Sequence, residues 1–368
     1  MSIISILIFI IILLVLVMVH ELGHFLTAKL TGCRVDEFAF GFPPTLWKKK
    51  IGETEYKLNA LPIGGYVKIW GEDGGETNDK RVFSNRPKWA QILVLMAGVT
   101  MNWLLAFIIF FIIAKSNALV SADDPLYKGK VKDTQLVIVD VSKKSPAYYA
   151  GIRPGYIVES IVVNGSNGVA SSRADISKGD NVKDFFNKNI DNNITINWLN
   201  GYDKGVSTVT GVYGINKDKK AIGISFEVLG HLSLSFGESI DKAWRDTKLY
   251  TILTIQGLGE LGRGIVNADR DILNSLSGPV GIAKVVGEQT QSGSASNLFL
   301  LSAILSINLA VFNLLPFPAL DGGRILMVLY EMVTRKKINM NKAALINGIG
   351  FVILFLLIVV VTINDFLK

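Results

Sequence analysis

Residues 2–25 read SIISILIFIIILLVLVMVHELGHF, an apolar run that ends in a cluster of ionisable residues. Residues 2–19 are apolar and uncharged. At 1.5 Å rise per residue they form a helix long enough to cross the roughly 30 Å hydrocarbon core of a bilayer. A cleaved signal peptide is not expected, because no Lys or Arg precedes the apolar run, the run is too long, and no small-residue cleavage site follows it. We therefore predict a first transmembrane helix that stays in the protein.

Three further uncharged apolar stretches follow, at residues 91–114, 296–320 and 343–364. Hydrophobic residues make up 49% of the 368-residue chain, which is too apolar for an ordinary soluble protein. A buried core helix can imitate one such stretch, but four of them in one chain favour a membrane class. The sequence predicts an α-helical polytopic membrane protein with about four transmembrane helices.

The net charge of +7 invites comparison with nucleic-acid-binding proteins, but the positions of the basic residues argue against that class. Eleven Lys or Arg lie within residues 25–88, after the first span, and five more lie within residues 321–342, between the third and the fourth. Short cationic loops stay on the cytoplasmic side of a membrane, and a four-span topology puts both clusters there. We therefore expect the termini and the large middle region outside the cytoplasm, the lipid bilayer as a partner, and no nucleic acid.

The first span ends in His20-Glu21-Leu22-Gly23-His24. On a helix, residues four apart lie on one face with about 5–6 Å between them, so His20 and His24 can share one metal ion. Glu21 lies about 100° further round the helix and can reach a water at that ion without being a ligand. Such segments bind Zn2+ through the two imidazoles and use the Glu as general base. The alternative is that both imidazoles only hydrogen-bond inside the helix bundle.

A catalytic zinc ion needs a third protein ligand and one open position. The best candidate is Asp321, at the end of the third apolar stretch in the segment NLLPFPALDGGR, residues 313–324. Pro316 and Pro318 forbid a regular helix there, and broken backbone at membrane depth is tolerated only where it is buried in protein or lines a cavity. A carboxylate in that place needs a partner, which a metal would supply. A helix cap or an ion pair with Arg324 is the alternative.

Polar side chains also occur inside the second and third apolar stretches, at Asn102, Asn308 and Asn313. Bonding between helices is the default role for each of them. Asn313 stands directly before the broken segment and is the best candidate for contact with substrate or an oxyanion. The one cysteine, Cys33, excludes an intramolecular disulfide and is expected to be a small buried side chain. His231 is expected on the surface of a loop.

Between the spans the composition predicts two β-rich regions. Residues 34–70 carry paired glycines with β-branched and aromatic residues, as strands or hairpins do. Residues 127–229 hold short apolar runs divided by turn residues, which indicates a small β-rich module with one short helix near residues 181–189. Residues 234–290 favour two or three helices at the membrane surface.

Taken in order, these motifs resemble the site-2 proteases, the bacterial intramembrane zinc metalloproteases. The residues that carry the resemblance are Val19-His20-Glu21-Leu22-Gly23-His24-Phe25, Pro62-Ile63-Gly64-Gly65-Tyr66-Val67-Lys68, Gly98 with Asn102, Ser277-Gly278-Pro279-Val280-Gly281-Ile282, Asn313-Leu314-Leu315-Pro316 and Leu320-Asp321-Gly322-Gly323. The resemblance implies His20, His24 and Asp321 as zinc ligands and Glu21 as the catalytic base.

The resemblance also implies a membrane-re-entrant β-structure whose edge strand pairs with an unwound substrate helix, with Gly65, Tyr66 and Val67 as substrate contacts beside Asn313. The middle module resembles a PDZ domain, although Tyr156 stands where such modules often have Asp. The residues that carry this second resemblance are Ser145-Pro146-Ala147, Ala150-Gly151-Ile152, Pro154-Gly155, Ile157 and Ile161 through Asn164-Gly165.

The predicted organisation is therefore a helical membrane protein with one inserted PDZ-like domain. Its parts are transmembrane helix 1 with the zinc motif at 1–30, the re-entrant β-region at 34–70, transmembrane helix 2 at 91–114, the PDZ-like domain at 127–229, membrane-surface helices at 234–290, transmembrane helix 3 with the Asp ligand at 296–330, and transmembrane helix 4 at 343–364.

The function implied is endopeptidase cleavage of transmembrane segments, of the anti-sigma-factor or signal-peptide-remnant type, at the inner membrane of a bacterial cell. The partners implied are single-span membrane protein substrates and an upstream site-1-type protease that trims them. One alternative is a non-catalytic membrane adaptor that binds partners through the PDZ-like domain. Another is a zinc-dependent hydrolase of lipid-like substrates.

Overall fold

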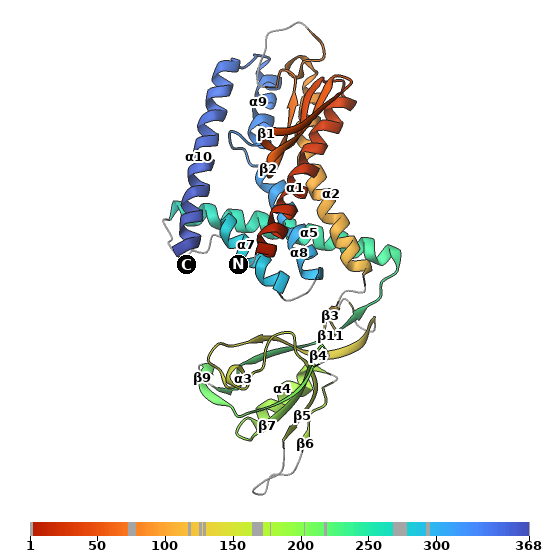
Figure 1. Cartoon of the computed structure of the whole chain (residues 1–368), viewed down its shortest axis with the longest axis vertical. Coiled ribbons are helices and arrows are strands. Elements are labelled where there is room, and N and C mark those ends of the chain that lie inside the picture. The colour runs from red at the N-terminus through yellow and green to blue at the C-terminus, as the bar shows by residue number, and fades with distance from the viewer. Residues whose placement is uncertain are drawn as a thin grey trace. The chain divides into compact units, whose positions relative to one another are not determined.

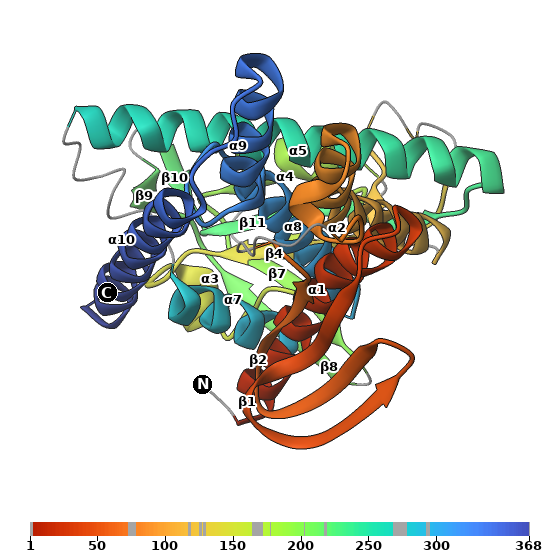
Figure 2. The ribbon, with the colours of Figure 1, turned by 90° about the horizontal axis from the view of Figure 1, so that it is seen from above.

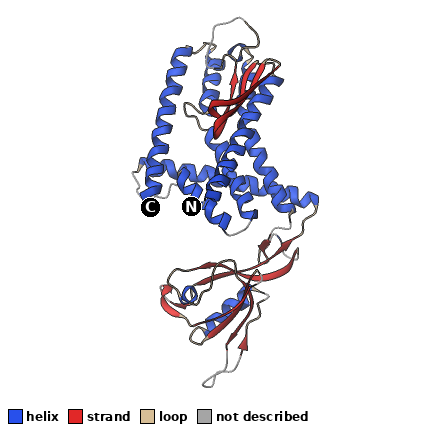
Figure 3. Cartoon of the chain, viewed as in Figure 1, coloured by secondary structure: helices blue, strands red, loops and turns tan. Residues whose placement is uncertain are grey.

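The computed structural model describes most of the chain. The described residues are 3–72, 79–116, 119–124, 127, 130–163, 172–176, 178–201, 203–216, 219–267, 278–291 and 295–367. Ser277, Asn164 and Gly165, which carry part of the resemblances above, lie outside them. The chain divides into two compact units, one of Met1–Ile113 with Ile240–Lys368 and the other of Ala114–Ser239. Helices predominate in the first unit and strands in the second (Figure 3).

The elements follow one another along the chain as Figure 1 labels them. They are α1 (Ile3–Leu30), β1 (Val35–Ile51), β2 (Thr54–Ile69), the short 3-10 helix Phe83–Asn85, α2 (Lys88–Lys115), β3 (Leu119–Ser121), β4 (Val131–Val141), α3 (Pro146–Tyr149), β5 (Ile157–Val163), β6 (Ser172–Arg173), α4 (Gly179–Asn189), β7 (Ile194–Asn200), β8 (Asp203–Val209), β9 (Val212–Asn216), β10 (Lys219–Ala221), β11 (Ile224–Leu232), α5 (Phe236–Val266), α7 (Pro279–Gln291), α8 (Ala295–Asn313), α9 (Asp321–Thr334) and α10 (Met340–Leu367).

Among the described residues, four helices are long and apolar enough to cross a membrane: Ile3–Leu30, Lys88–Lys115, Ala295–Asn313 and Lys342–Phe366. Their outward faces are lined with exposed apolar side chains. In α10 only 6% of the apolar window is buried inside the protein. Water would make such exposure costly, whereas lipid favours it, and a helix satisfies its backbone polar groups internally. The expectation of a membrane protein with about four spanning helices and additional β-structure is confirmed at this level.

Two helices run crosswise to α1, α2 and α10 in the first unit, namely α5 and α7 (Figure 1). Seen from above, α5 passes along one side of the helix group (Figure 2). Aromatic side chains attach it to α2, where Tyr250 stacks on Phe110 with 5.3 Å between ring centroids. A hydrogen bond of 2.8 Å from the Thr254 hydroxyl to the side-chain Oδ1 of Asn308 attaches it to α8. Asn308 thus has the default role of a polar residue in a membrane helix, which is to bridge two helices.

The third apolar stretch is interrupted where its prolines predict a break. Helix α8 ends at Asn313, and α9 begins at Asp321. Two glycines let α9 start against the connecting segment. A Cβ atom on Gly322 would lie 2.3 Å from the Leu314 carbonyl oxygen, and one on Gly323 would lie 2.2 Å from that of Phe317. The Gly-Gly pair therefore permits a backbone approach that places Asp321 at the first turn of α9.

Strands β1 and β2 form a curled hairpin that packs along α1 (Figure 1). The register pairs Phe38 with both Val67 and Tyr56, so the first part of β1 lies between two parts of β2. Within the described residues, segment 65–69 of β2 pairs on one side only, with residues 35–40. Its other side is therefore an open strand edge, which can accept a further strand.

The second unit is built on a sheet with strand order β3-β11-β4-β5-β7-β8, and β6 pairs with β5. Helix α4 packs on this sheet through Val182 and Phe186. The core is mostly aliphatic, with Ile138, Ile161 and Ile196 almost fully buried. His231, expected in a loop, lies in strand β11 because its neighbours continue the ladder with β3 and β4, although its side chain is exposed as expected.

Cys33 follows directly after α1 and is buried. Burial raises the pKa of its thiol above the usual value, which keeps the thiol in its unreactive protonated form. This agrees with the expectation of a small buried side chain.

Candidate metal centre

Helix α1 presents His20 and His24 on one face, four residues apart, as the spacing predicts. Both imidazoles are buried, with 6% and 8% of the residue surface exposed. Their Nε2 atoms lie 3.1 Å apart, and the ring planes are nearly perpendicular. Two nitrogen atoms thus point at one spot inside the protein.

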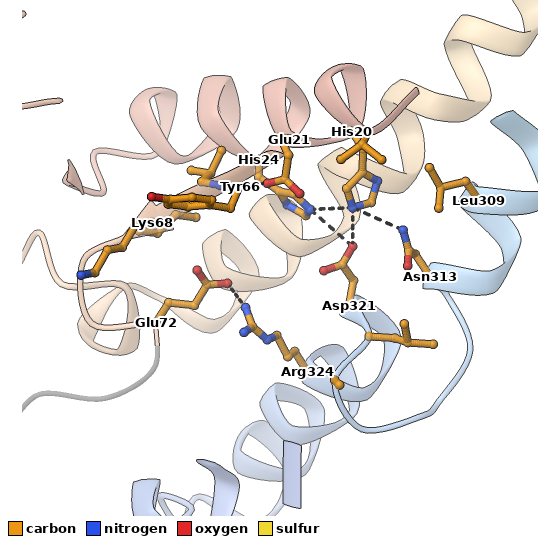
Figure 4. A pocket seen from close by; sticks show the side chains of 15 residues that line it. His20, Glu21, His24, Tyr66, Lys68, Glu72, Leu309, Asn313, Asp321 and Arg324 are labelled. Atoms are coloured by element: carbon orange, nitrogen blue, oxygen red, sulfur yellow. Dashed lines mark hydrogen bonds and ion pairs between the residues drawn. The ribbon is translucent and has the colours of Figure 1, made fainter. Parts of the chain in front are cut away.

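Asp321 joins them from the start of α9, almost three hundred residues later in the chain (Figure 4). Its Oδ2 atom lies 3.1 Å from Nε2 of His20 and 3.3 Å from Nε2 of His24. This oxygen is buried, and within the described part of the chain it has no well-formed hydrogen bond. An ionised oxygen buried without a hydrogen bond is costly unless it meets a positive charge, and a metal ion would be one.

The three atoms have the spacing that a zinc ion requires. Ligand atoms about 2.0–2.1 Å from zinc in a tetrahedral arrangement are separated by about 3.3 Å. The three separations here are 3.1, 3.1 and 3.3 Å. No other group of three or more His, Cys, Asp or Glu within metal-binding reach occurs among the described residues. The donor set of two imidazoles and one carboxylate therefore fits zinc with one position left open.

The close approach of α1 and α2 at this level fixes how His24 is oriented. Its Nδ1 atom donates a hydrogen bond of 2.9 Å to the carbonyl oxygen of Val94 in α2. In a neutral imidazole this leaves the lone pair on Nε2, the atom that faces Asp321. Glycines make the approach possible, since a Cβ atom on Gly23 would lie 2.5 Å from the Ala97 carbonyl oxygen, and one on Gly98 would lie 2.4 Å from Nε2 of His24.

Glu21 lies beside the three-atom cluster but turns toward the β-hairpin. Its Oε2 atom accepts a 3.0 Å hydrogen bond from the backbone N–H of Val67. Val67 belongs to the part of β2 whose edge is open, so the carboxylate lies between the candidate metal site and that edge. A cavity of about 490 Å³ connects the two, and Tyr66 is among its lining residues.

The two remaining asparagines of the apolar helices both approach His20. The Nδ2 atom of Asn313 lies 3.4 Å from Nε2 of His20 and lines the cavity (Figure 4). The carboxamide of Asn102 lies on the opposite side of the ring, 3.5 Å from Nδ1. Gly65 lies in the open edge, next to Tyr66 in the chain, but it does not line the cavity.

Two features of this site are not predicted by the sequence. One is the Val94 carbonyl, because every residue type has a backbone carbonyl and the sequence cannot mark this one. The other is the ion pair between Glu72 and Arg324, which closes one wall of the cavity. The sequence also allows an ion pair between Asp321 and Arg324 in place of a metal ion. In the structure it pairs with Glu72, while the Asp321 carboxylate faces the imidazoles.

Comparison with known proteins supports the same chemistry. The model of the family described as peptidase family M50 matches residues 8–357. A protein of Clostridium perfringens named "Putative zinc metalloprotease" is 35% identical over 350 residues, covering 95% of both chains. One of the same description from Clostridium acetobutylicum is 33% identical, covering 99% of this chain and 98% of its own. A "Probable membrane metalloprotease ARASP2, chloroplastic" of Arabidopsis thaliana is 30% identical, covering 96% of this chain and 79% of its own.

Proposed function

The chain belongs to peptidase family M50 and is a zinc metalloprotease of a membrane, and from this premise we propose that it is an intramembrane endopeptidase that cuts transmembrane segments of other proteins. The observation that carries the proposal is that the Val67 N–H on the open edge of β2 bonds to Glu21, next to the cluster of His20, His24 and Asp321. A substrate strand added to this edge would therefore lie beside the proposed catalytic groups.

The proposed ligands are His20, His24 and Asp321, and Glu21 is the proposed base. When bound, zinc supplies a Lewis acid that polarises a carbonyl and makes water more acidic. Glu21 takes the proton from the attacking water on its carboxylate and later delivers it to the leaving nitrogen. Asn313 is the proposed donor of a hydrogen bond to the developing oxyanion, and the 3.4 Å between its Nδ2 and Nε2 of His20 supports this role.

We propose that residues 65–69 receive the substrate as an added strand. A peptide bond inside a helix is shielded by its own hydrogen bonds, and strand addition to an open edge holds the substrate extended. The N–H that such a strand would use at Val67 is held by Glu21 in the present structure. Pairing of a substrate carbonyl with Val67 would therefore release Glu21 for proton transfer, which couples substrate docking to the availability of the base.

The second unit is proposed to be the PDZ-like domain and to act outside the cytoplasm as a docking site or size filter. It would admit single-span substrates, of the anti-sigma-factor or signal-peptide-remnant type, already trimmed by an upstream site-1-type protease. We propose that the active site lies toward the cytoplasmic face of a bacterial inner membrane. The basic segments after α1 and between α9 and α10 support this orientation by the positive-inside rule.

The catalytic assignment is tested with Glu21→Gln, which keeps the size of the side chain but removes the base. The full-length variant is co-expressed with a candidate single-span substrate that lacks its outer domain. Loss of general-base catalysis predicts a fall in cleavage of about 10²–10⁴-fold, with bound zinc retained. Glu260→Gln, the same change at an exposed position of α5, is the matched control and leaves cleavage unchanged.

The ligand assignment is tested in parallel with Asp321→Ala. Removing one of three ligands predicts a loss of bound zinc in the purified protein, whereas Glu21→Gln keeps it. Wild-type cleavage by Glu21→Gln contradicts the mechanism, and unchanged metal content in Asp321→Ala means that another residue is the third ligand.

A further inference from the structure

The two imidazoles of the candidate metal centre are held by different kinds of partner. Nδ1 of His24 donates to a backbone carbonyl, that of Val94, at 2.9 Å. Nδ1 of His20 faces a side chain, the carboxamide of Asn102 on α2, at 3.5 Å. The first partner persists whatever side chain stands at position 94. The second depends on one residue type.

An imidazole that binds a metal through Nε2 must carry its proton on Nδ1. Histidine ligands almost always donate that proton to a carboxylate, a carbonyl or a water, which sets both the tautomer and the ring orientation. His24 has such an acceptor in the Val94 carbonyl. His20 needs one as well, because its Nε2 lies 3.1 Å from Oδ2 of Asp321.

Asn102 has the chemistry and the location for this role. It is fully buried, at 0% exposure, and its Oδ1 atom has no hydrogen-bond donor among the described residues. A half-turn of the planar carboxamide about Cβ–Cγ exchanges its oxygen and nitrogen, which brings that oxygen to Nδ1 of His20. We propose that Asn102 is a positioning residue that accepts the Nδ1–H of His20 and holds this imidazole ready for zinc.

Two other roles for Asn102 fit the structure less well. Substrate contact requires access to the cavity, and a fully buried side chain behind the imidazole has none. Bridging of α2 to α8 is already carried by its backbone, because the Ser306 hydroxyl donates to the Asn102 carbonyl oxygen at 2.7 Å. The side-chain carboxamide of Asn102 is therefore available to hydrogen-bond with His20. Asn308, by contrast, uses its carboxamide oxygen on Thr254 of another helix.

This inference rests on the proposed zinc site and is tested by zinc affinity rather than by cleavage. Full-length wild type, Asn102→Leu and Asn102→Asp are purified in detergent, and their zinc affinity is measured by competition with a chelator. Leu keeps the approximate volume but accepts no hydrogen bond, so we expect binding to weaken about 10–100-fold. Asp offers a carboxylate to the same Nδ1–H and is expected to restore most of the affinity.

Ser306→Ala is the matched control, since it removes a buried hydrogen bond to the backbone of Asn102, between α8 and α2, without touching His20. Its zinc affinity should equal that of the wild type. Equal binding by Asn102→Leu and wild type overturns the inference, and so does Asn102→Asp binding as weakly as Asn102→Leu while both fold. If the wild type itself binds no zinc at this site, the proposed function fails instead, so the two failures are distinguishable.

Discussion

The interiors of the two units differ in the kinds of side chain that they bury. Among the described residues of the second unit, the fully buried large side chains are aliphatic, with Ile138, Ile161 and Ile196 among them, and the buried polar side chains are serine hydroxyls. In the first unit, the described buried residues include two imidazoles and a carboxamide, at His20, His24 and Asn102. The second unit has an ordinary hydrophobic core, whereas the first unit buries the polar side chains of the candidate metal centre.

The difference follows from the solvent around each unit. A unit in water gains stability by removing apolar surface from it, so its interior is filled with hydrocarbon. Helices in lipid gain nothing comparable, because lipid is as apolar as their side chains, and the polar groups they bury are generally functional. Changes beside the imidazoles of the first unit should therefore alter the metal site, and changes in the core of the second should alter stability alone.

The largest effect of a change inside the first unit is expected on zinc affinity, from a single methyl group added at Gly98. Replacing glycine by alanine within a helix normally stabilises it by about 1 kcal/mol. Here the added Cβ atom would lie 2.4 Å from Nε2 of His24 and 2.8 Å from Nε2 of His20, so the imidazoles or the helices must move. We expect Gly98→Ala to lose zinc affinity by at least the roughly 10–100-fold of a lost supporting contact, and cleavage with it.

Gly348→Ala is the control for that change, because a Cβ atom at position 348 in α10 meets nothing within 4 Å. It should leave zinc content and cleavage as in the wild type. If Gly98→Ala retains its zinc, the methyl group fits beside the imidazoles, and the expected sensitivity of the metal site to this change is contradicted.

The motif on α1 is predictable from sequence because His20, Glu21 and His24 lie on one helix, where spacing determines which side chains share a face. Asp321 can be proposed as well, since two prolines in an apolar stretch mark a break that must line a cavity. The spanning helices are also predictable, because a run of about twenty apolar residues has the length and the hydrophobicity that crossing a bilayer requires.

What the sequence could not supply depends on how distant elements meet. The acceptor for His24 is a backbone carbonyl, and any residue at position 94 would offer one. The role of Asn102 depends on which helix face meets α1, and near-uniform apolar helices carry almost no pattern to indicate that. His231 is expected in a loop, whereas pairing with two neighbouring strands, which are distant in sequence, keeps it in β11.

The next effect tests the other side of the comparison. Ile196 is fully buried in the sheet core, so Ile196→Ala should lower the stability of the second unit by about 2–4 kcal/mol through lost burial and a residual cavity. The change is measured by heating the full-length protein and using the protease sensitivity of the second unit to detect its unfolding. Zinc content should remain that of the wild type, and zinc loss in a variant that is still folded would contradict the separation of roles.

The smallest effect is expected at the open edge of β2, where the tested group is a backbone N–H. Val67→Pro removes the N–H that bonds to Glu21 while keeping an apolar side chain, and proline is tolerated where a strand edge faces away from its partner. If a substrate strand pairs there, one backbone hydrogen bond worth about 1 kcal/mol is lost, and kcat/KM falls roughly 5–10-fold.

Val67→Ala keeps the N–H and is the control for Val67→Pro, because it changes only the side chain. Zinc content should be the same in both variants, since neither touches His20, His24 or Asp321. A fall in kcat/KM for the proline variant alone assigns the effect to the backbone donor, as strand addition requires. An equal fall in both variants would instead assign it to the side chain, and the substrate would then bind the cavity by apolar contact rather than by pairing with the edge.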